Sequence, residues 1–208
     1  MNTATLQHSI IPVGSYCVNC VILWQDARCI VVDPGQDADA IIAFMEERAL
    51  VPQAIILTHC HFDHIGGVPG ILAKHPGLPV YAHPSDWLML GHPMNQVPPE
   101  YPSVPRPANL LDVRDAPGAL EGFGLRVLET PGHTPGSVCL MFGGLLLSGD
   151  TLFAGSCGRT DFPGGSMAAM RRSLAALAEL PPDTEVVPGH GASTTIAREV
   201  ADNPFMER

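Results

Sequence analysis

Three histidines and an aspartate fall within six residues of the segment THCHFDHIGG, which covers residues 58–67. His59, His61, Asp63 and His64 carry the imidazole and carboxylate groups that bind zinc, iron and manganese in proteins. The cluster follows directly on the apolar run AIIL at residues 54–57, which is typical of a buried strand. Because loops at the ends of rigid strands often carry functional groups, these four residues are candidate metal ligands.

Three further candidates follow apolar runs later in the chain. His133 lies in TPGHTPGS, Asp150 in LLLSGDTLF and His190 in VVPGHGA. Each has Gly or Pro nearby, as residues in turns at strand ends do. With the first cluster they make seven potential ligands, which is more than the four that a single tetrahedral metal site uses.

The elements that must position these ligands are short strands and amphipathic helices. Strands are predicted at residues 15–24, 29–32, 54–57, 79–82, 125–129, 138–142, 145–148 and 185–188. Helices are predicted at residues 38–50, 68–74, 84–90, 166–180 and 194–202. Gly143 and Gly144 predict a hairpin turn, and Ser166 is a candidate N-cap. Strands and helices are mixed in both halves without a repeat or linker, which favours one α/β (α+β) domain over residues 1–208.

Residues 92–108 contain six prolines and little periodicity, which predicts a long loop. A functional loop and a plain surface crossover are both compatible with this composition.

Composition excludes several classes of function. The net charge of −10 disfavours nucleic-acid binding, because proteins that neutralise phosphates are basic. No apolar run is long enough for a transmembrane helix, so we expect no membrane partner. The N-terminal residues lack the basic and apolar regions of a signal peptide, so we expect a cytoplasmic location.

The sequence CVNC at residues 17–20 raises the question of a zinc site formed by cysteines. Within a predicted strand, positions i and i+3 face opposite sides and do not easily share a metal. No second pair stands at zinc-finger spacing. We therefore interpret Cys17 and Cys20 as buried free thiols.

The pattern H-x-H-x-D-H followed by a separate His, Asp and His resembles that of the metallo-β-lactamase-fold hydrolases, and its motifs extend from residue 58 to 191. The resemblance implies an αββα sandwich, with two mixed sheets packed face to face and helices outside. It also implies how the ligands divide between two divalent metal ions. His59, His61 and His133 would bind the first ion, Asp63, His64 and His190 the second, and Asp150 would bridge them.

The segment LFAGSCGRTDFPGG at residues 152–165 resembles the matching loop of glyoxalase II. It is more similar still to that of the small glyoxalase II-like (hydroxyacylglutathione hydrolase-like) proteins and of persulfide dioxygenases. The resemblance implies hydrolysis of a small-molecule thioester such as S-lactoylglutathione by a hydroxide that bridges the two metals. Asp63 and Asp150 would be the catalytic carboxylates, and zinc is the default metal among zinc, iron and manganese.

Arg159 is the candidate substrate-binding residue. In glyoxalase II the matching position is a Lys that contacts the glycine carboxylate of glutathione, and Arg can bind a carboxylate through two hydrogen bonds. The alternative is an internal ion pair between Arg159 and Asp161. Two departures from the longer glyoxalase II enzymes are expected: there is no room for their helical C-terminal domain in the residues after His190, and their glutathione-binding tyrosines have no counterpart.

Other activities stay open on the same residues. A mononuclear iron persulfide dioxygenase would share much of the loop at 152–165, and a lactone or other ester hydrolase would share the ligands. A metal-binding scaffold without turnover is the non-enzymatic alternative. The expected protein is a monomer or homodimer.

Overall fold

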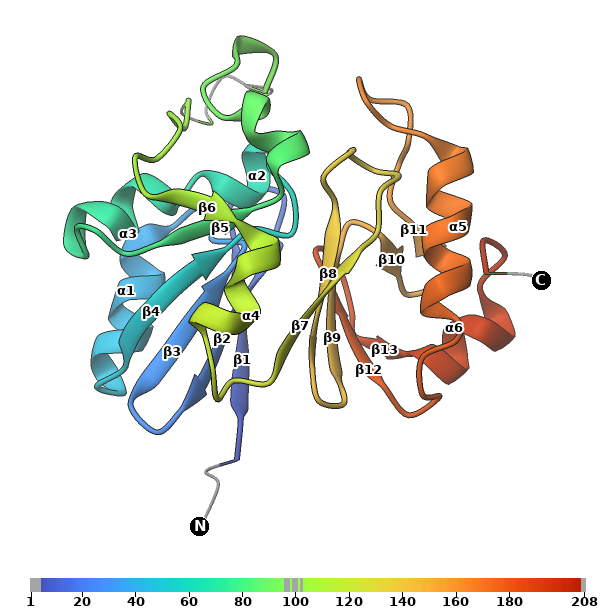
Figure 1. Ribbon diagram of the computed structural model, residues 1–208, viewed down its shortest axis with the longest axis horizontal. Helices are drawn as coiled ribbons and strands as arrows, with labels where there is room; N and C mark the ends of the chain where they lie inside the picture. Colours follow the sequence, from blue (N-terminus) through green and yellow to red (C-terminus); the bar gives the residue numbers. More distant parts are fainter. Residues whose placement is uncertain (1–4, 96–97, 99–100, 102, 207–208) are drawn as a thin grey trace.

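The computed structural model describes residues 5–95, 98, 101 and 103–206. Two β-sheets pack face to face, and helices cover the outer side of each sheet, so that the layers run helix, sheet, sheet, helix (Figure 1). This architecture is the αββα sandwich expected from the sequence.

The first sheet contains six strands within the described residues, in the order in which they occur along the chain. They are β1 (Gln7–Val13), β2 (Val18–Gln25), β3 (Arg28–Val32), β4 (Val51–Ile56), β5 (Val80–Ala82) and β6 (Leu110–Asp112). The first three strands pair antiparallel, and β3 to β6 pair parallel. The carboxyl ends of β3 to β6 therefore lie at one edge of the sheet.

The second sheet has the order β13-β12-β9-β8-β7. Its strands are β7 (Leu125–Glu129), β8 (Val138–Phe142), β9 (Leu145–Gly149), β12 (Glu185–Pro188) and β13 (Thr194–Thr195). Strands β9 and β12 are parallel, and the other pairs are antiparallel. A separate two-stranded ribbon is formed by β10 (Leu152–Phe153) and β11 (Ser156–Cys157).

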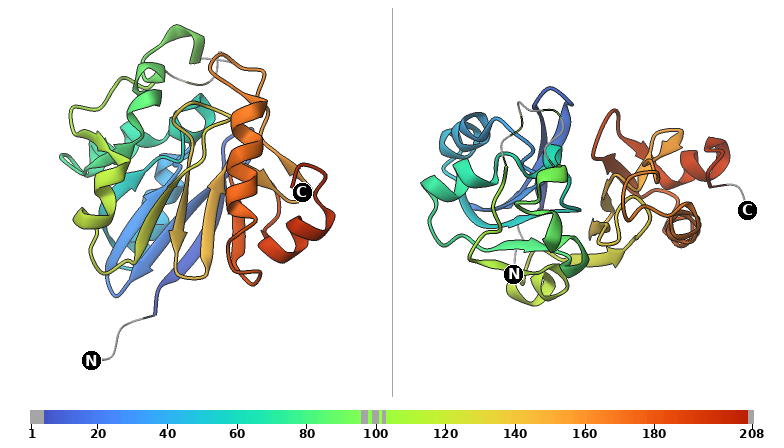
Figure 2. Two further views of the ribbon diagram at one scale, coloured as in Figure 1. Left: turned by 45° about the vertical axis from the view of Figure 1, so that its right-hand side comes forward. Right: turned by 90° about the horizontal axis from the view of Figure 1, so that it is seen from above.

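Two helical layers complete the sandwich, as the view from above shows (Figure 2). The helices are α1 (Ala38–Glu47), α2 (Phe62–Ile65), α3 (Val68–Lys74), α4 (Ala116–Ala119), α5 (Met167–Leu177) and α6 (Ile196–Asp202). Helices α1 and α3 pack on the first sheet, and α5 and α6 pack on the second. No helix in the described part of the chain is long and apolar enough to cross a membrane.

Alternation along the strands explains how each sheet is buried on both faces. In β2, Val21 and Leu23 face the second sheet, whereas Cys20 and Ile22 face the helices. Successive side chains of a strand point to opposite faces, so a strand that is apolar at every position fits only between two apolar layers. The core between the sheets and the two cores under the helices are therefore separate.

The predicted elements are found with changed limits. The strand predicted from residue 15 begins at Val18, because residues 14–17 form a turn in which the Cys17 amide donates to the Gly14 carbonyl oxygen at 3.1 Å. The prediction that Cys17 is buried is wrong, because this turn exposes it, with a positive φ of 51°. Cys20, further along the strand, is buried as predicted.

The turn and capping predictions are confirmed. Gly143, with φ of +60°, and Gly144 connect β8 to β9 in a hairpin. The Ser166 side chain accepts a hydrogen bond from the Ala169 amide at 3.2 Å at the start of α5.

Other segments differ from expectation. Strand β1 was not predicted, and the helix expected at 84–90 is a 3₁₀ helix, η1 (Pro84–Met89). The long loop predicted at 92–108 lies partly outside the described residues, at 96–97, 99–100 and 102. Its described part includes a short 3₁₀ turn, η2 (Pro93–Asn95).

The core between the sheets offers a direct test of this packing. Leu140 lies in that core with 0% of its surface exposed, whereas Leu88 is 83% exposed. Leu140→Ala should lower the free energy of unfolding in urea by about 2–5 kcal/mol, because it removes buried methyl groups and leaves a cavity. Leu88→Ala is the matched control and should change it by less than about 0.5 kcal/mol. Equal effects of the two changes would contradict the position of Leu140.

Candidate metal centre

The seven candidate ligands come together in loops at one edge of the sandwich, the upper edge in Figure 1. The segment 57–61 follows β4 and leads into α2, which carries Asp63 and His64. His133 follows β7, Asp150 follows β9 and His190 follows β12. Each sheet therefore supplies ligands from the carboxyl ends of its strands, and the loops from both sheets meet there.

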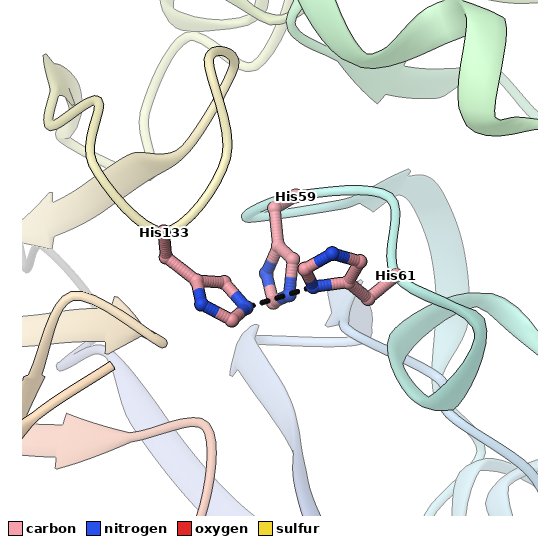
Figure 3. Close-up of side chains that lie close together, drawn as sticks. All are labelled: His59, His61 and His133. Carbon is pink, nitrogen blue, oxygen red and sulfur yellow. Dashed lines mark hydrogen bonds between the residues drawn. The ribbon is translucent and has the colours of Figure 1, made fainter. Parts of the chain in front are cut away.

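Three histidines form the first group. The ligand atoms of His59, His61 and His133 all lie within 4.8 Å of one another. His61 Nδ1 and His133 Nε2 are 2.7 Å apart (Figure 3). Burial and the neighbouring histidines lower the pKa of His59 well below its usual value, and burial together with His133 lowers the pKa of His61 to about 3. Both rings are therefore held neutral, the form in which imidazole binds a metal.

A second group combines Asp63, His64 and His190, whose ligand atoms also lie within 4.8 Å of one another. His190 Nε2 is 3.3 Å from an Asp63 oxygen. Burial alone would lower the pKa of His64, but the carboxylates of Asp150, Asp33 and Asp63 outweigh it and raise the pKa well above its usual value. This part of the cluster therefore attracts positive charge.

Asp150 lies between the two groups. One of its oxygens is 3.4 Å from His133 Nε2, in the first group, and 3.7 Å from His190 Nε2, in the second. The other is 3.4 Å from His64 Nε2. Burial would raise the pKa of Asp150, but the histidines around it hold that pKa well below its usual range, so the carboxylate stays ionised.

Unpaired polar atoms test whether these residues fit a metal. His59 Nε2, His64 Nε2 and Asp150 Oδ1 are buried without a hydrogen-bond partner. Buried polar atoms nearly always have partners, and leaving one unpaired costs about 1–3 kcal/mol. All three atoms belong to the ligand groups, and a divalent cation would satisfy them. The donor set of imidazole and carboxylate therefore fits metal ions here.

The histidine rings are oriented by hydrogen bonds from their other nitrogen. His64 Nδ1 is 3.0 Å from Asp33 Oδ2, His133 Nδ1 is 2.7 Å from the Arg159 carbonyl oxygen, and His190 Nδ1 is 3.0 Å from the Tyr16 carbonyl oxygen. Each of these acceptors requires the proton on Nδ1 and leaves Nε2 free to bind a metal.

Asp33 supports the candidate centre through hydrogen bonds and was missed by the sequence analysis. Besides His64, it accepts hydrogen bonds from the backbone amide and the hydroxyl of Thr58, at 2.7 and 2.6 Å. Its position in VVDPG, directly after a strand and before Pro-Gly, is the same signal that singled out Asp150. The carboxylate fixes the start of the ligand loop as well as one ligand.

Close backbone packing surrounds Asp150. A side chain at Gly189 would place its Cβ 2.3 Å from Asp150 Oδ1 and 2.8 Å from His64 Cε1. Only glycine therefore lets the loop that carries His190 approach the carboxylate this closely.

Aromatic rings and one ion pair lie at the open side of the centre. Phe162 contacts His61 edge to face, with ring centroids 5.5 Å apart. Arg159 stacks on Phe162, and its Nε and Nη2 donate to the two Asp161 oxygens, each at 2.7 Å. The internal ion pair considered as the alternative role of Arg159 is thus present, and substrate binding by Arg159 stays a prediction.

The cysteines of CVNC do not join the centre. Among the described residues, the groups that could hold a metal consist of histidine and aspartate only. Burial raises the pKa of the Cys20 thiol well above its usual value, which disfavours the thiolate that binds metals.

Comparisons with known proteins agree with this geometry. A family model described as the metallo-beta-lactamase superfamily matches residues 16–190. The hydroxyacylglutathione hydrolase GloC of Haemophilus influenzae is 32% identical, over 95% of this chain and 96% of its own length. The crystal structure of the BLEG-1 B3 metallo-beta-lactamase has a TM-score of 0.87 and 35% identity, covering 96% of this chain and 99% of that one. The crystal structure of TTHA1623 in a di-iron-bound form has a TM-score of 0.83 and 37% identity, covering 95% of this chain and 99% of that one.

Asp33 gives the first prediction about the centre. Asp33→Asn should weaken the binding of the metal ion held by His64 about 10- to 100-fold, because an amide cannot accept all three hydrogen bonds. Titration with zinc against a competing chelator measures the change. Asp26→Asn is the matched control, since Asp26 is exposed in the turn between β2 and β3 and has a positive φ that Asn tolerates. Unchanged zinc affinity in Asp33→Asn would show that this hydrogen bonding does not matter for the metal.

Proposed function

The chain belongs to the metallo-beta-lactamase superfamily, and from this premise we propose that it is a two-metal hydrolase of small-molecule thioesters, of the glyoxalase II type. The observation that carries the proposal is the convergence of the seven ligands in two groups on either side of Asp150. Similarity to a hydroxyacylglutathione hydrolase over nearly the whole chain supports the choice of thioesters.

The proposed division of the ligands follows two of the three groups that their distances define, and His59 also lies near His64 and Asp150. One ion would be held by His59, His61 and His133, and the other by Asp63, His64 and His190, with Asp150 shared between them. Zinc is the default metal in this proposal, with iron and manganese as alternatives, because imidazole and carboxylate suit all three. The similarity to TTHA1623 in a di-iron-bound form keeps iron among the alternatives.

Two divalent ions bound there would supply an activated water molecule as nucleophile and positive charge for the developing oxyanion. The protein's own part is to fix the geometry and to balance the charge. Asp150 is ionised and only 11% exposed, so it offsets cationic charge where water screens it weakly. The His190 side chain is 27% exposed, against 3% for His133, so the centre is in contact with solvent at His190.

Arg159 is the proposed contact for an anionic part of the substrate. Its guanidinium is exposed at the open side of the centre, where a carboxylate can replace Asp161 as its partner. Exposed ion pairs contribute only about 0–1 kcal/mol, so this exchange is not costly.

Hydrolysis of β-lactams is a second candidate, because the chain is 35% identical to the BLEG-1 B3 metallo-beta-lactamase over almost all of that protein. The same residues would serve, since both reactions place a nucleophilic water against a carbonyl carbon.

A direct assay separates these activities. Protein loaded with zinc, iron or manganese is incubated with S-lactoylglutathione, with a chromogenic cephalosporin, and with sulfide and glutathione under oxygen. We expect release of the thiol from the thioester without oxygen uptake, and two metal ions per chain. Oxygen uptake with a single iron would identify a persulfide dioxygenase instead. Rapid turnover of the cephalosporin alone would make lactam hydrolysis the function.

The shared carboxylate gives a prediction for this proposal. Asp150→Asn should keep the fold but lose at least one metal ion and most of the activity, because a neutral amide is a poor bridging ligand. Metal analysis and the thioester assay measure both effects. Asp183→Asn, in an exposed turn, is the control and should behave as wild type. An Asp150→Asn protein with two metal ions and full turnover would exclude the bridging role.

The substrate contact gives another prediction. Arg159→Ala should raise KM for S-lactoylglutathione about 10- to 100-fold with kcat nearly unchanged, because a charged hydrogen bond of roughly 1.5–3 kcal/mol is lost from ground and transition states alike. Arg159→Lys keeps the charge and should recover part of the loss. A thioester with the glycine carboxylate amidated is the control substrate, since its KM should not respond to the change. An equal loss on both substrates would show that Arg159 has only a structural role.

A further inference from the structure

Asp86 is a buried carboxylate in η1 that takes no part in the proposed ligand groups. None of its surface is exposed. An ionised carboxylate away from water is costly unless hydrogen bonds compensate it, so its partners reveal what it holds in place.

Those partners come from two loops that carry ligands. Asp86 Oδ2 accepts hydrogen bonds from the Thr134 hydroxyl at 2.7 Å and from the Cys60 amide at 3.3 Å, and Oδ1 accepts one from the Gly136 amide at 2.8 Å. Cys60 stands between His59 and His61 in the sequence, and Thr134 directly follows His133. One carboxylate therefore ties together the loops that supply all three histidines of the first group.

The two loops belong to different sheets. The segment with Cys60 follows β4 in the first sheet, whereas Thr134 and Gly136 lie between β7 and β8 in the second. The distance from His61 Nδ1 to His133 Nε2, 2.7 Å, spans the same junction. A connection at the backbone of both loops therefore controls whether the three rings stay within reach of one ion.

Packing leaves Asp86 little freedom. A Cβ added at Gly136 would lie 2.6 Å from Asp86 Cγ and Oδ1, so the loop backbone is in close contact with the carboxylate. Thr134 is itself held by Ser137, whose hydroxyl is 2.8 Å from the Thr134 hydroxyl. On the other side, the Asn95 side chain donates to the Cys60 carbonyl oxygen at 2.7 Å. Burial raises the pKa of Asp86, and the hydrogen bonds from Thr134, Gly136 and Cys60 oppose that rise.

We propose that Asp86 is a positioning residue that holds His59, His61 and His133 in register and thereby sets the affinity of the first group for its metal ion. The inference rests on the proposed division of the ligands between two ions. Asp33 contacts His64 of the other group, and also Thr58, which precedes His59 in the loop after β4. Asp86 joins two loops of different sheets, whereas these contacts of Asp33 lie on the loop after β4 alone. A loss confined to the ion of the first group would separate the role of Asp86 from a general contribution to stability.

The test is a zinc titration of the full-length protein against a competing chelator, which gives a dissociation constant for each ion. His133→Ala and His190→Ala first identify which step belongs to which group. Asp86→Asn should then raise the dissociation constant of the zinc-binding step that is lost in His133→Ala about 10- to 100-fold. The dissociation constant of the other step should stay within about twofold of wild type. The reason is that an amide keeps one acceptor oxygen and turns an NH₂ group toward the remaining donors.

Two further variants make the result decisive. Thr134→Val removes one of the three donors with little change of shape and should weaken the same step by a smaller factor. Asp115→Asn, on an exposed carboxylate, is the matched control and should change neither step. If Asp86→Asn fails to fold, the zinc affinity of Thr134→Val at the step lost in His133→Ala tests the proposal.

The outcomes separate the two proposals. Loss of both ions to the same extent, or of the ion identified by His190→Ala, would overturn the role of Asp86, as would unchanged binding in Asp86→Asn and Thr134→Val. A wild-type protein that binds one zinc, lost in His133→Ala, would contradict the two-ion assignment and still test Asp86 on that ion. A wild-type protein that binds no zinc would overturn both.

Discussion

The largely buried carboxylate of Asp150 lies among histidines from both sheets, and the loops at this edge are arranged around that contact. Ionised groups are stable away from water only when opposite charges and hydrogen bonds compensate them. Here the compensation comes from His64, His133 and His190, and three ligand atoms are still without a partner. The charge balance of the site therefore favours the binding of cations. Hydrogen bonds from the other nitrogen of the histidine rings hold those rings where cations would bind.

The sandwich makes such a site possible because its strands form the apolar cores, whereas its loops carry the polar groups of the site. The strand residues are occupied with three apolar cores, one between the sheets and one under each helical layer. Polar side chains are left to the loops at the strand ends, where the carboxyl ends of strands from both sheets meet. Two sheets that pack rigidly thus fix the distance between loops that are far apart in the sequence, and Asp33 and Asp86 fix the loops themselves.

The ligands and the open side of the centre are under different constraints. Ligand geometry is set by the needs of the metal and tolerates little change. At the open side, Phe162 and the exposed pair of Arg159 and Asp161 contact solvent, and their replacement would not disturb the cores. Because the two are separate, substrate choice has to be argued from side chains such as Arg159 rather than from the fold.

The sequence by itself indicated most of the elements and the candidate ligands. His59, His61, Asp63 and His64 are close in sequence, so their proximity needs only a local turn after β4, and continuous apolar runs identify most of the long strands. The resemblance to the superfamily then implied how the loops that carry His133, Asp150 and His190 come together, which spacing alone does not show.

Only the tertiary structure decided the contacts between distant segments. Asp33 reaches Thr58, and Asp86 reaches Thr134 and Gly136. The exposure of Cys17 was mispredicted because this residue, with its positive φ, lies in a turn, and the strand begins only at Val18. The physical reason is the same throughout: local periodicity reports which face of an element is buried, whereas the partner of a buried polar group depends on which loops the packing of two sheets brings together.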